Sequence, residues 1–172
     1  MGGERSDEVP EVLVDCHRRM RQVVTLAADL AARADAPPDE VREVVKRVHR
    51  YFTVALRMHE EDEERSLFPR LVARSPALGP TVERLRADHQ AQQARVGEVL
   101  ATCEELLASP ERFAARRGAL GAAAWALLDS WEVHLALEEA ELFPAVRTAL
   151  TSAERAAIED EMRARRADLP PR

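Results

Sequence analysis

The chain has 172 residues, of which 46% are hydrophobic, 33% are charged and only 4% are aromatic, and its formal net charge is −6. These values are typical of one soluble domain with a sizeable core. The negative, well-mixed charge argues against a cationic surface for nucleic acid, and no apolar run approaches the roughly 18 residues that cross a membrane. The first residues also lack the apolar run of a signal peptide, so we expect a cytoplasmic protein with neither nucleic acid nor membrane as partner.

The composition predicts an all-α fold. Alanine, leucine, glutamate and arginine dominate, and no stretch alternates apolar β-branched residues as a strand would. Cys16 and Cys103 lie far apart outside any CxxC pattern, which predicts two reduced thiols rather than a disulfide.

In the first half of the chain, a tail and two helices are expected. Residues 1–10 are polar and end in a proline, which predicts a flexible tail. Apolar residues recur every three or four positions over 11–33, as in an amphipathic helix. The prolines within 35–39 reverse the chain, and a second helix is expected over 39–67. Prolines and a glycine then predict a loop over 69–80.

In the second half, three more helices are expected. A helix over 81–108 is followed by Ser109, which we expect to cap a helix over 110–143 that has proline at its first position. The sequence Thr-Ser-Ala-Glu at 151–154 resembles a capping box and opens a short helix that ends at about residue 166. We expect this last helix to pack outside the others.

Short connections make successive helices antiparallel, which predicts an up-down-up-down four-helix bundle over residues 11–146. A short extra C-terminal helix and tail occupy 147–172. The outer faces, rich in alanine and leucine, allow a monomer or a weak homodimer.

One pattern, H-x-x-x-E-E-x-x-L-F-P, occurs twice, beginning at His59 and again at His134. A histidine and a glutamate four positions apart share one face of a helix, so each copy aims an imidazole and a carboxylate at one point. The pairs His59 with Glu63 and His134 with Glu138 are therefore candidate metal ligands. The closing proline lacks a backbone donor and is expected to end each helix.

Two further histidines, His17 and His89, lie on the apolar stripes of their helices. At about 1.5 Å per residue, His17 and His59 both lie roughly 30 Å from the turn between their helices, and His89 and His134 are spaced similarly about the next turn. All four should therefore meet at one end of the bundle. Four imidazoles and two carboxylates exceed the four ligands of a structural zinc. They suit two metals bridged by the carboxylates, with iron the first choice and manganese the second.

The doubled motif, with a lone histidine before each copy, resembles the hemerythrin-like (HHE cation-binding) domain family in its bacterial single-domain form. The resemblance covers about residues 11–146. It implies two non-haem irons with an oxo or hydroxo bridge. Six residues are the implied ligands, four terminal histidines and two bridging glutamates: His17, His59, His89, His134, Glu63 and Glu138.

This chain departs from the oxygen-carrying members at one position. They place a second histidine one turn after the first on the third helix, where this chain has Gln93. Each iron would then have two histidines and one oxygen from each carboxylate, which leaves an open position on both.

The open positions favour peroxide breakdown, a catalase-like reaction of the di-iron centre itself, or another way of handling O2, H2O2 or NO in oxidative stress. The alternative is a module that senses, stores or carries O2, NO or iron without turnover. A third reading is an interaction protein whose metal only stabilises the bundle.

Several other residues are candidates for roles near the site or in the core. Gln92 and Gln93 either donate hydrogen bonds to metal-bound oxygen or lie at the boundary and bind water. His49 lies about 15 Å along the axis from His59 and off its face, so we expect it outside the site. The acidic run beside the first motif is interpreted as a solvated helix face rather than an iron-entry path: Glu60, Glu61, Asp62 and Glu64. Three aromatic residues are expected in the core: Phe52, Trp125 and Trp131. The L-F-P ends of both motifs are expected to shield the site from water.

Overall fold

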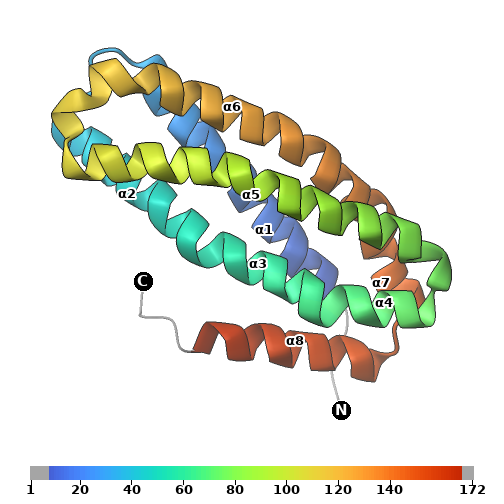
Figure 1. Ribbon diagram of the computed structural model, residues 1–172. Coiled ribbons are helices and arrows are strands. Elements are labelled where there is room, and N and C mark those ends of the chain that lie inside the picture. The colour runs from blue at the N-terminus through green and yellow to red at the C-terminus, as the bar shows by residue number, and fades with distance from the viewer. Residues whose placement is uncertain (1–7, 168–172) are drawn as a thin grey trace.

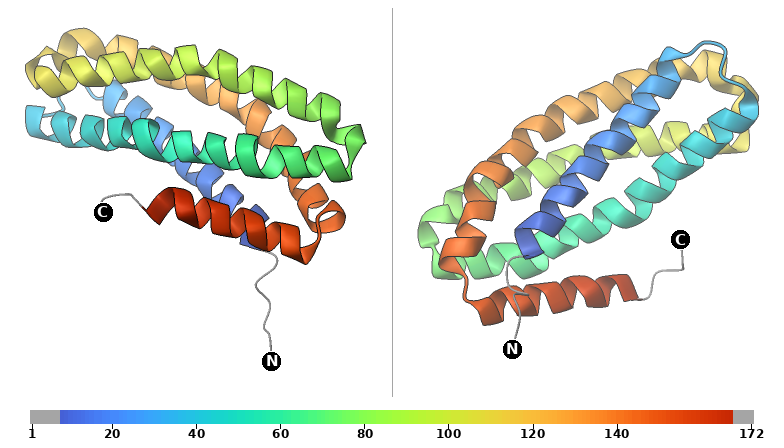
Figure 2. Two further views of the ribbon diagram at one scale, coloured as in Figure 1. Left: turned by 60° about the horizontal axis from the view of Figure 1, so that its bottom comes forward. Right: turned by 180° about the vertical axis from the view of Figure 1, so that it is seen from behind.

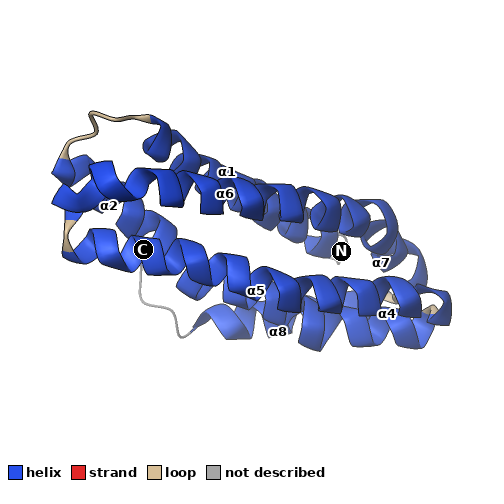
Figure 3. Cartoon of the chain, turned by 45° about the horizontal axis from the view of Figure 1, so that its top comes forward, coloured by secondary structure: helices blue, strands red, loops and turns tan. Residues whose placement is uncertain are grey.

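The computed structural model describes residues 8–167, and within this range every regular element is helical and no strand occurs (Figures 1 and 3). The predicted all-α helical bundle is confirmed. The α-helices are α1 (Glu8–Ala32), α2 (Pro38–Arg50), α3 (Arg57–Glu61), α4 (Phe68–Arg74), α5 (Gly79–Ala108), α6 (Phe113–Leu137), α7 (Phe143–Ala149) and α8 (Ser152–Ala167). Among these helices, none is both long and apolar enough to span a bilayer.

Short π-helical and 3-10 segments join or precede these helices. The π-helical segments are η1 (Tyr51–Leu56), η2 (Asp62–Leu67) and η5 (Glu138–Leu142), and the 3-10 turns are η3 (Pro76–Leu78) and η4 (Pro110–Arg112). Because η1 and η2 leave no gap between α2, α3 and α4, residues 38–74 form one continuous rod. In the same way η5 joins α6 to α7 in a rod over 113–149.

The long helices pack side by side in a four-membered arrangement. Helix α1 packs against α2 and α6, and α5 packs against the same two. The connections at 33–37 and 109–112 lie at one end of the molecule, and the connection at 75–78 lies at the other (Figure 1).

The two motif prolines do not end their helices, contrary to the sequence prediction. Pro69 lies in α4 directly after the π-helical segment η2, and Pro144 lies in α7 directly after η5. Proline has no N–H and its ring crowds the carbonyl four residues earlier in an α-helix. A π-helical turn bonds i to i+5 and so changes this register, which lets the rod continue past the proline.

Other predicted boundaries also shift. Helix α1 begins at Glu8 rather than residue 11, because Val9 is fully buried and belongs to the core. The loop predicted over 69–80 shrinks to residues 75–78. Ser109 precedes the turn η4 without a side-chain capping bond, so that prediction was wrong.

The capping box before α8 is confirmed. The backbone N–H of Glu154 donates to Oγ1 of Thr151 at 3.2 Å, and the backbone N–H of Thr151 donates to the Glu154 carboxylate at 2.8 Å. These reciprocal bonds satisfy donors that the first turn of a helix otherwise leaves without partners.

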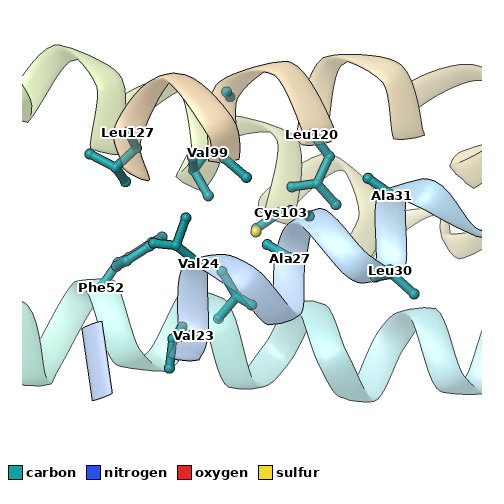
Figure 4. Close-up of a cluster of buried hydrophobic side chains, with 14 of the residues drawn as sticks. Val23, Val24, Ala27, Leu30, Ala31, Phe52, Val99, Cys103, Leu120 and Leu127 are labelled. Atoms are coloured by element: carbon teal, nitrogen blue, oxygen red, sulfur yellow. The ribbon is translucent and has the colours of Figure 1, made fainter. Parts of the chain in front are cut away.

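Two separate clusters of buried apolar side chains fill the bundle. The larger, the central core, comprises the buried residues from Met20 to Leu56, from Val99 to Leu106 and from Phe113 to Leu135. Figure 4 shows part of it, with Phe52, Cys103 and Leu127 directed into the space between the helices. The second, the end core, comprises Val9, Leu13, Leu67, Phe68, Leu71, Val82, Leu85, Leu142, Phe143, Val146, Leu150, Ile158 and Met162.

Helix α8 lies along the outside of the rods, against α1, α3 and η2 (Figure 2). Its Ile158 and Met162 complete the end core. Two arginines of α8 also reach a nearly fully buried carboxylate: Nη1 of Arg165 lies 2.7 Å from Oδ1 of Asp62, and Nη2 of Arg166 lies 2.5 Å from Oδ2. The helix is therefore anchored by apolar and ionic contacts together.

One predicted core residue is not in the core. Trp131 and Phe52 are 1% and 2% exposed and pack edge to face, with ring centroids 5.8 Å apart. Trp125, however, is 55% exposed on the outer face of α6. The thiols of Cys16 and Cys103 are both free, as predicted.

Candidate metal centre

Six side chains from the long helices converge between the two cores. His17 comes from α1, His59 and Glu63 from the α2–α4 rod, and His89 from α5. The α6–α7 rod contributes His134 and Glu138. Their potential ligand atoms form two groups, in each of which all atoms lie within 4.8 Å of one another: His17, His59, Glu63 and Glu138, and Glu63, His89, His134 and Glu138.

Each carboxylate belongs to both groups, because its two oxygens face different histidines. Oε2 of Glu138 lies 3.2 Å from Nε2 of His17, and its Oε1 lies 3.2 Å from Nε2 of His134. Oε1 and Oε2 of Glu63 lie 3.4 Å from Nε2 of His59 and of His89. A carboxylate in this position can bridge two ions, each of which would also have two imidazoles.

The site is almost completely enclosed. All six side chains are buried, and the most exposed residue, His89, is only 6% exposed. Yet no hydrogen-bond partner is found for six of the atoms that face the centre: Nε2 of His17, Nε2 of His59, and both carboxylate oxygens of Glu63 and of Glu138. Buried polar atoms are normally paired, so a group of lone ones facing a common point needs an explanation. Bound cations supply one, since nitrogen and carboxylate oxygen are both metal ligands.

Burial also perturbs the protonation of these groups. Burial and the facing Glu138 raise the pKa of Glu63 well above its usual value. Burial and the neighbouring His17 lower the pKa of His59 to about 3. Burial acts to raise the pKa of Glu138 too, but contacts with His134 and His17 lower it overall. A pair of cations would favour charged carboxylates and neutral imidazoles, which is the state that ligation requires.

Two of the histidines have a carboxylate on their other ring nitrogen. Nδ1 of His17 lies 2.8 Å from Oε1 of Glu139, and Nδ1 of His89 lies 2.9 Å from Oε1 of Glu64. An ionised carboxylate only accepts, so these contacts place a proton on Nδ1 of each ring, and in the neutral imidazole this leaves Nε2 as the nitrogen that can bind a metal. Nδ1 of His59 has no partner, and Nδ1 of His134 lies 3.6 Å from the nearest carboxylate oxygen.

Aromatic rings close the side of the site that faces the end core. The ring of Phe68 stacks on His89 with a centroid distance of 6.0 Å, and that of Phe143 lies 5.2 Å from His17. Both phenylalanines are at most 3% exposed. They come from the L-F-P ends of the two motifs and lie where they exclude water, although the prolines after them do not end the helices.

Comparison with family models places the chain in a known family. The model for the hemerythrin HHE cation-binding domain matches residues 9–165, which is most of the chain. The chain belongs to the hemerythrin family. No curated protein shows significant similarity to it.

The six residues that the sequence singled out as ligands of the hemerythrin domain are thus brought together by the fold. The distances along the helices predicted that these residues meet at one end of the bundle, and this prediction was wrong. Beyond the ligands the rods continue to Arg74 and Ala149, and the end core lies there. The centre therefore lies between two apolar clusters.

The two candidate glutamines face different directions. Gln92 is 3% exposed, and its amide donates to the carbonyl of Ser130 at 3.5 Å. Gln93 faces solvent. The position that carries a second histidine in oxygen-carrying hemerythrins is therefore directed away from the centre in this chain. His49 lies outside the centre, 3.5 Å from a carboxylate oxygen of Glu104.

The acidic run of the first motif is not a solvated face. Asp62 is 1% exposed and bound by α8, and Glu64 contacts His89. The sequence reasoning missed both Glu64 and its counterpart Glu139 as neighbours of the ligands. A signal was available, because both copies of the motif contain two successive glutamates and only the first was assigned as a candidate ligand.

Proposed function

We propose that this hemerythrin domain binds two iron ions between its four histidines and two glutamates. The observation that carries the proposal is the pair of buried carboxylates, each lying between two histidines from different helices. Imidazole and carboxylate ligands suit iron, with manganese the second choice. Iron in such a centre supplies redox chemistry toward small oxygen and nitrogen-oxide molecules.

The residues around the ions limit what can react there. Each ion would have four protein atoms, two imidazole nitrogens and two carboxylate oxygens, in the groups described above. Gln93 faces solvent and Gln92 is engaged with a backbone carbonyl, so neither completes the ligand set. A coordination position for a small molecule would thus stay available on each ion. The burial of the ligands restricts access to small molecules such as O2, H2O2 and NO.

For the activity, we propose the breakdown of two H2O2 to two H2O and one O2. Its support is the equivalence of the two metal positions, which allows a two-electron change to be shared between them. Phe68 and Phe143 exclude bulk water, and the carboxylates hold the two positions side by side. Binding of O2, NO or iron without turnover is the alternative.

The same proposal covers the wider organisation of the chain. We infer that residues 11–146 form the metal-binding four-helix bundle with up-down-up-down connectivity, and that 147–172 are a short C-terminal helix and tail. Within this segment, Ile158 and Met162 of α8 contribute to the end core. The two free thiols fit a reducing compartment such as the cytoplasm. We expect a monomer or a weak homodimer.

The test is metal analysis of the aerobically purified protein, followed by visible spectroscopy and O2 release after H2O2 is added. Two irons per chain and sustained O2 release would support the proposal, whereas a spectral change without turnover would favour the binding alternative. The His134→Gln variant should lose metal, while His49→Gln, which changes a histidine outside the centre, should retain it. One zinc, or no metal, in the wild-type protein would overturn the proposal.

A further inference from the structure

In both motifs, two successive glutamates contact the two nitrogens of one imidazole. Glu138 faces Nε2 of His17 at 3.2 Å, and Glu139 binds Nδ1 of the same ring at 2.8 Å. In the other half of the site, Glu63 faces Nε2 of His89 at 3.4 Å, and its successor binds Nδ1 at 2.9 Å. The same arrangement therefore occurs twice, on opposite sides of the carboxylate pair.

The backbone explains how neighbouring residues reach one ring. Successive side chains of an α-helix point about 100° apart. Both glutamate pairs lie in π-helical segments, Glu63 and Glu64 in η2 and Glu138 and Glu139 in η5. A π-helix turns through a smaller angle per residue, which brings successive carboxylates closer in direction.

The histidines held in this way are those without a ligand on their own helix. His59 and His134 each precede a bridging glutamate by four positions, so their helix fixes both ligands together. His17 and His89 stand alone on α1 and α5. Each lone histidine receives a carboxylate on Nδ1 from the facing rod, while His59 and His134 have no hydrogen bond there.

An arginine on the helix of each lone histidine holds the second glutamate in place. Arg21, one turn after His17, lies 3.2 Å from Glu139 and 2.9 Å from Glu132. Charge-assisted bonds of this kind are stronger than neutral ones. Glu139 therefore contacts both His17 and Arg21 of α1, and these three residues form a closed loop of contacts.

The other half of the site repeats this loop. Arg86, three residues before His89, lies 2.9 Å from Glu64 and 2.8 Å from Glu83. Glu64 and Glu139 are each about one-third exposed, at 32% and 35%, so both loops lie at the edge of the buried site.

We propose that Glu139 and Glu64 are positioning residues, each of which fixes the tautomer and ring orientation of one lone histidine so that its bare Nε2 points at one metal position. This inference rests on the proposed metal-binding function. Hydrogen-bond partners of metal-ligating histidines typically change metal affinity 10- to 100-fold when removed. Because each glutamate serves one position, each substitution weakens the binding of one ion and not the other.

The experiment compares Glu139→Leu and Glu64→Leu with two matched controls. Glu132→Leu and Glu83→Leu remove the other carboxylate from the same arginines but touch no histidine. Iron(II) or manganese(II) is titrated into each folded protein against a competing chelator. We expect each positioning variant to bind one of the two ions about 10- to 100-fold more weakly, and each control to match the wild type. Glu139→Gln and Glu64→Gln keep an acceptor oxygen and should lose less.

A second readout is the tautomer of each histidine in the metal-free protein, read from its ring nitrogens by NMR with ¹⁵N labelling. The wild type should show a protonated Nδ1 on His17 and on His89, and each leucine variant should lose this state at its own histidine alone. Unchanged tautomers in the leucine variants, or equal loss of affinity in the controls, would overturn the inference. If the wild-type protein binds no metal, the proposed function fails, but the tautomers still decide the role of the two glutamates.

Discussion

Removing the arginines that bind Asp62 should destabilise the protein in two unequal steps. Asp62 is 1% exposed, and each of its oxygens has one arginine partner from α8. Arg166→Met leaves one oxygen without its partner while Arg165 still compensates the charge, so we expect a loss of about 1.5 to 3 kcal/mol. Arg165→Met and Arg166→Met together leave a buried charge alone, which typically costs about 3 to 5 kcal/mol.

The assay is urea unfolding of the chelator-treated proteins at neutral pH, followed by circular dichroism. Adding Asp62→Leu to the double variant provides the control, because replacing a buried ionic group by apolar residues is often neutral or stabilising. We expect this triple variant to recover most of the lost free energy of unfolding. The reasoning would be refuted if the double variant lost less than about 1 kcal/mol, or if the triple variant were less stable than the double.

Four further predictions concern other parts of the molecule. Phe52→Ala should lower the free energy of unfolding in urea by about 3 to 5 kcal/mol, because the ring is fully packed in the central core. Hydrogen bonds from the backbone of Thr151 and from neighbouring side chains lower the pKa of Glu154 to about 2, so its stabilising effect should be present above pH 4.5 and disappear toward pH 2. The free energies of unfolding of the Glu154→Gln variant and of the wild type, measured across this pH range, should therefore converge in acid. Burial raises the pKa of Cys103 to about 12, so alkylation followed by mass spectrometry at pH 8 should leave it unmodified until the protein unfolds. Chelation of the metal should lower the melting temperature, and free metal at 100 times its dissociation constant should restore about 2.7 kcal/mol.

The six candidate ligands could be predicted because helical spacing fixes both the face and the height of a side chain. His59 and Glu63 are four positions apart in one rod, and counting residues from the turn places His17 beside them. The π-helical segments were not predictable from this periodicity, so the effect of Pro69 was misjudged. Nδ1 of His17, on α1, contacts Glu139 on the α6–α7 rod. Such a contact depends on how the helices pack together, which residue spacing along one helix does not predict.

The position of Trp125 illustrates a different limit. The segment around it is almost entirely alanine, leucine and glycine, so it has no polar face to show which side meets solvent. For the same reason, the sequence did not show which of Gln92 and Gln93 faces the interior, because two adjacent residues of one type do not indicate which side of the helix is buried. In both cases the direction of the side chain is set by the neighbouring helices.

The position of the candidate metal ligands between two apolar clusters affects how the domain opens. In every long helix the candidate ligands lie at the boundary between residues of the central core and residues of the end core. Without metal, a layer of buried polar groups lies between these clusters. The helices of the end core, α4, α7 and α8, can then open locally and exchange their amide hydrogens. Ligands from all four long helices on one pair of ions would tie the two clusters into a single cooperative unit. Metal loading should then slow amide exchange most at the far end of the molecule, in segments that contribute no ligand.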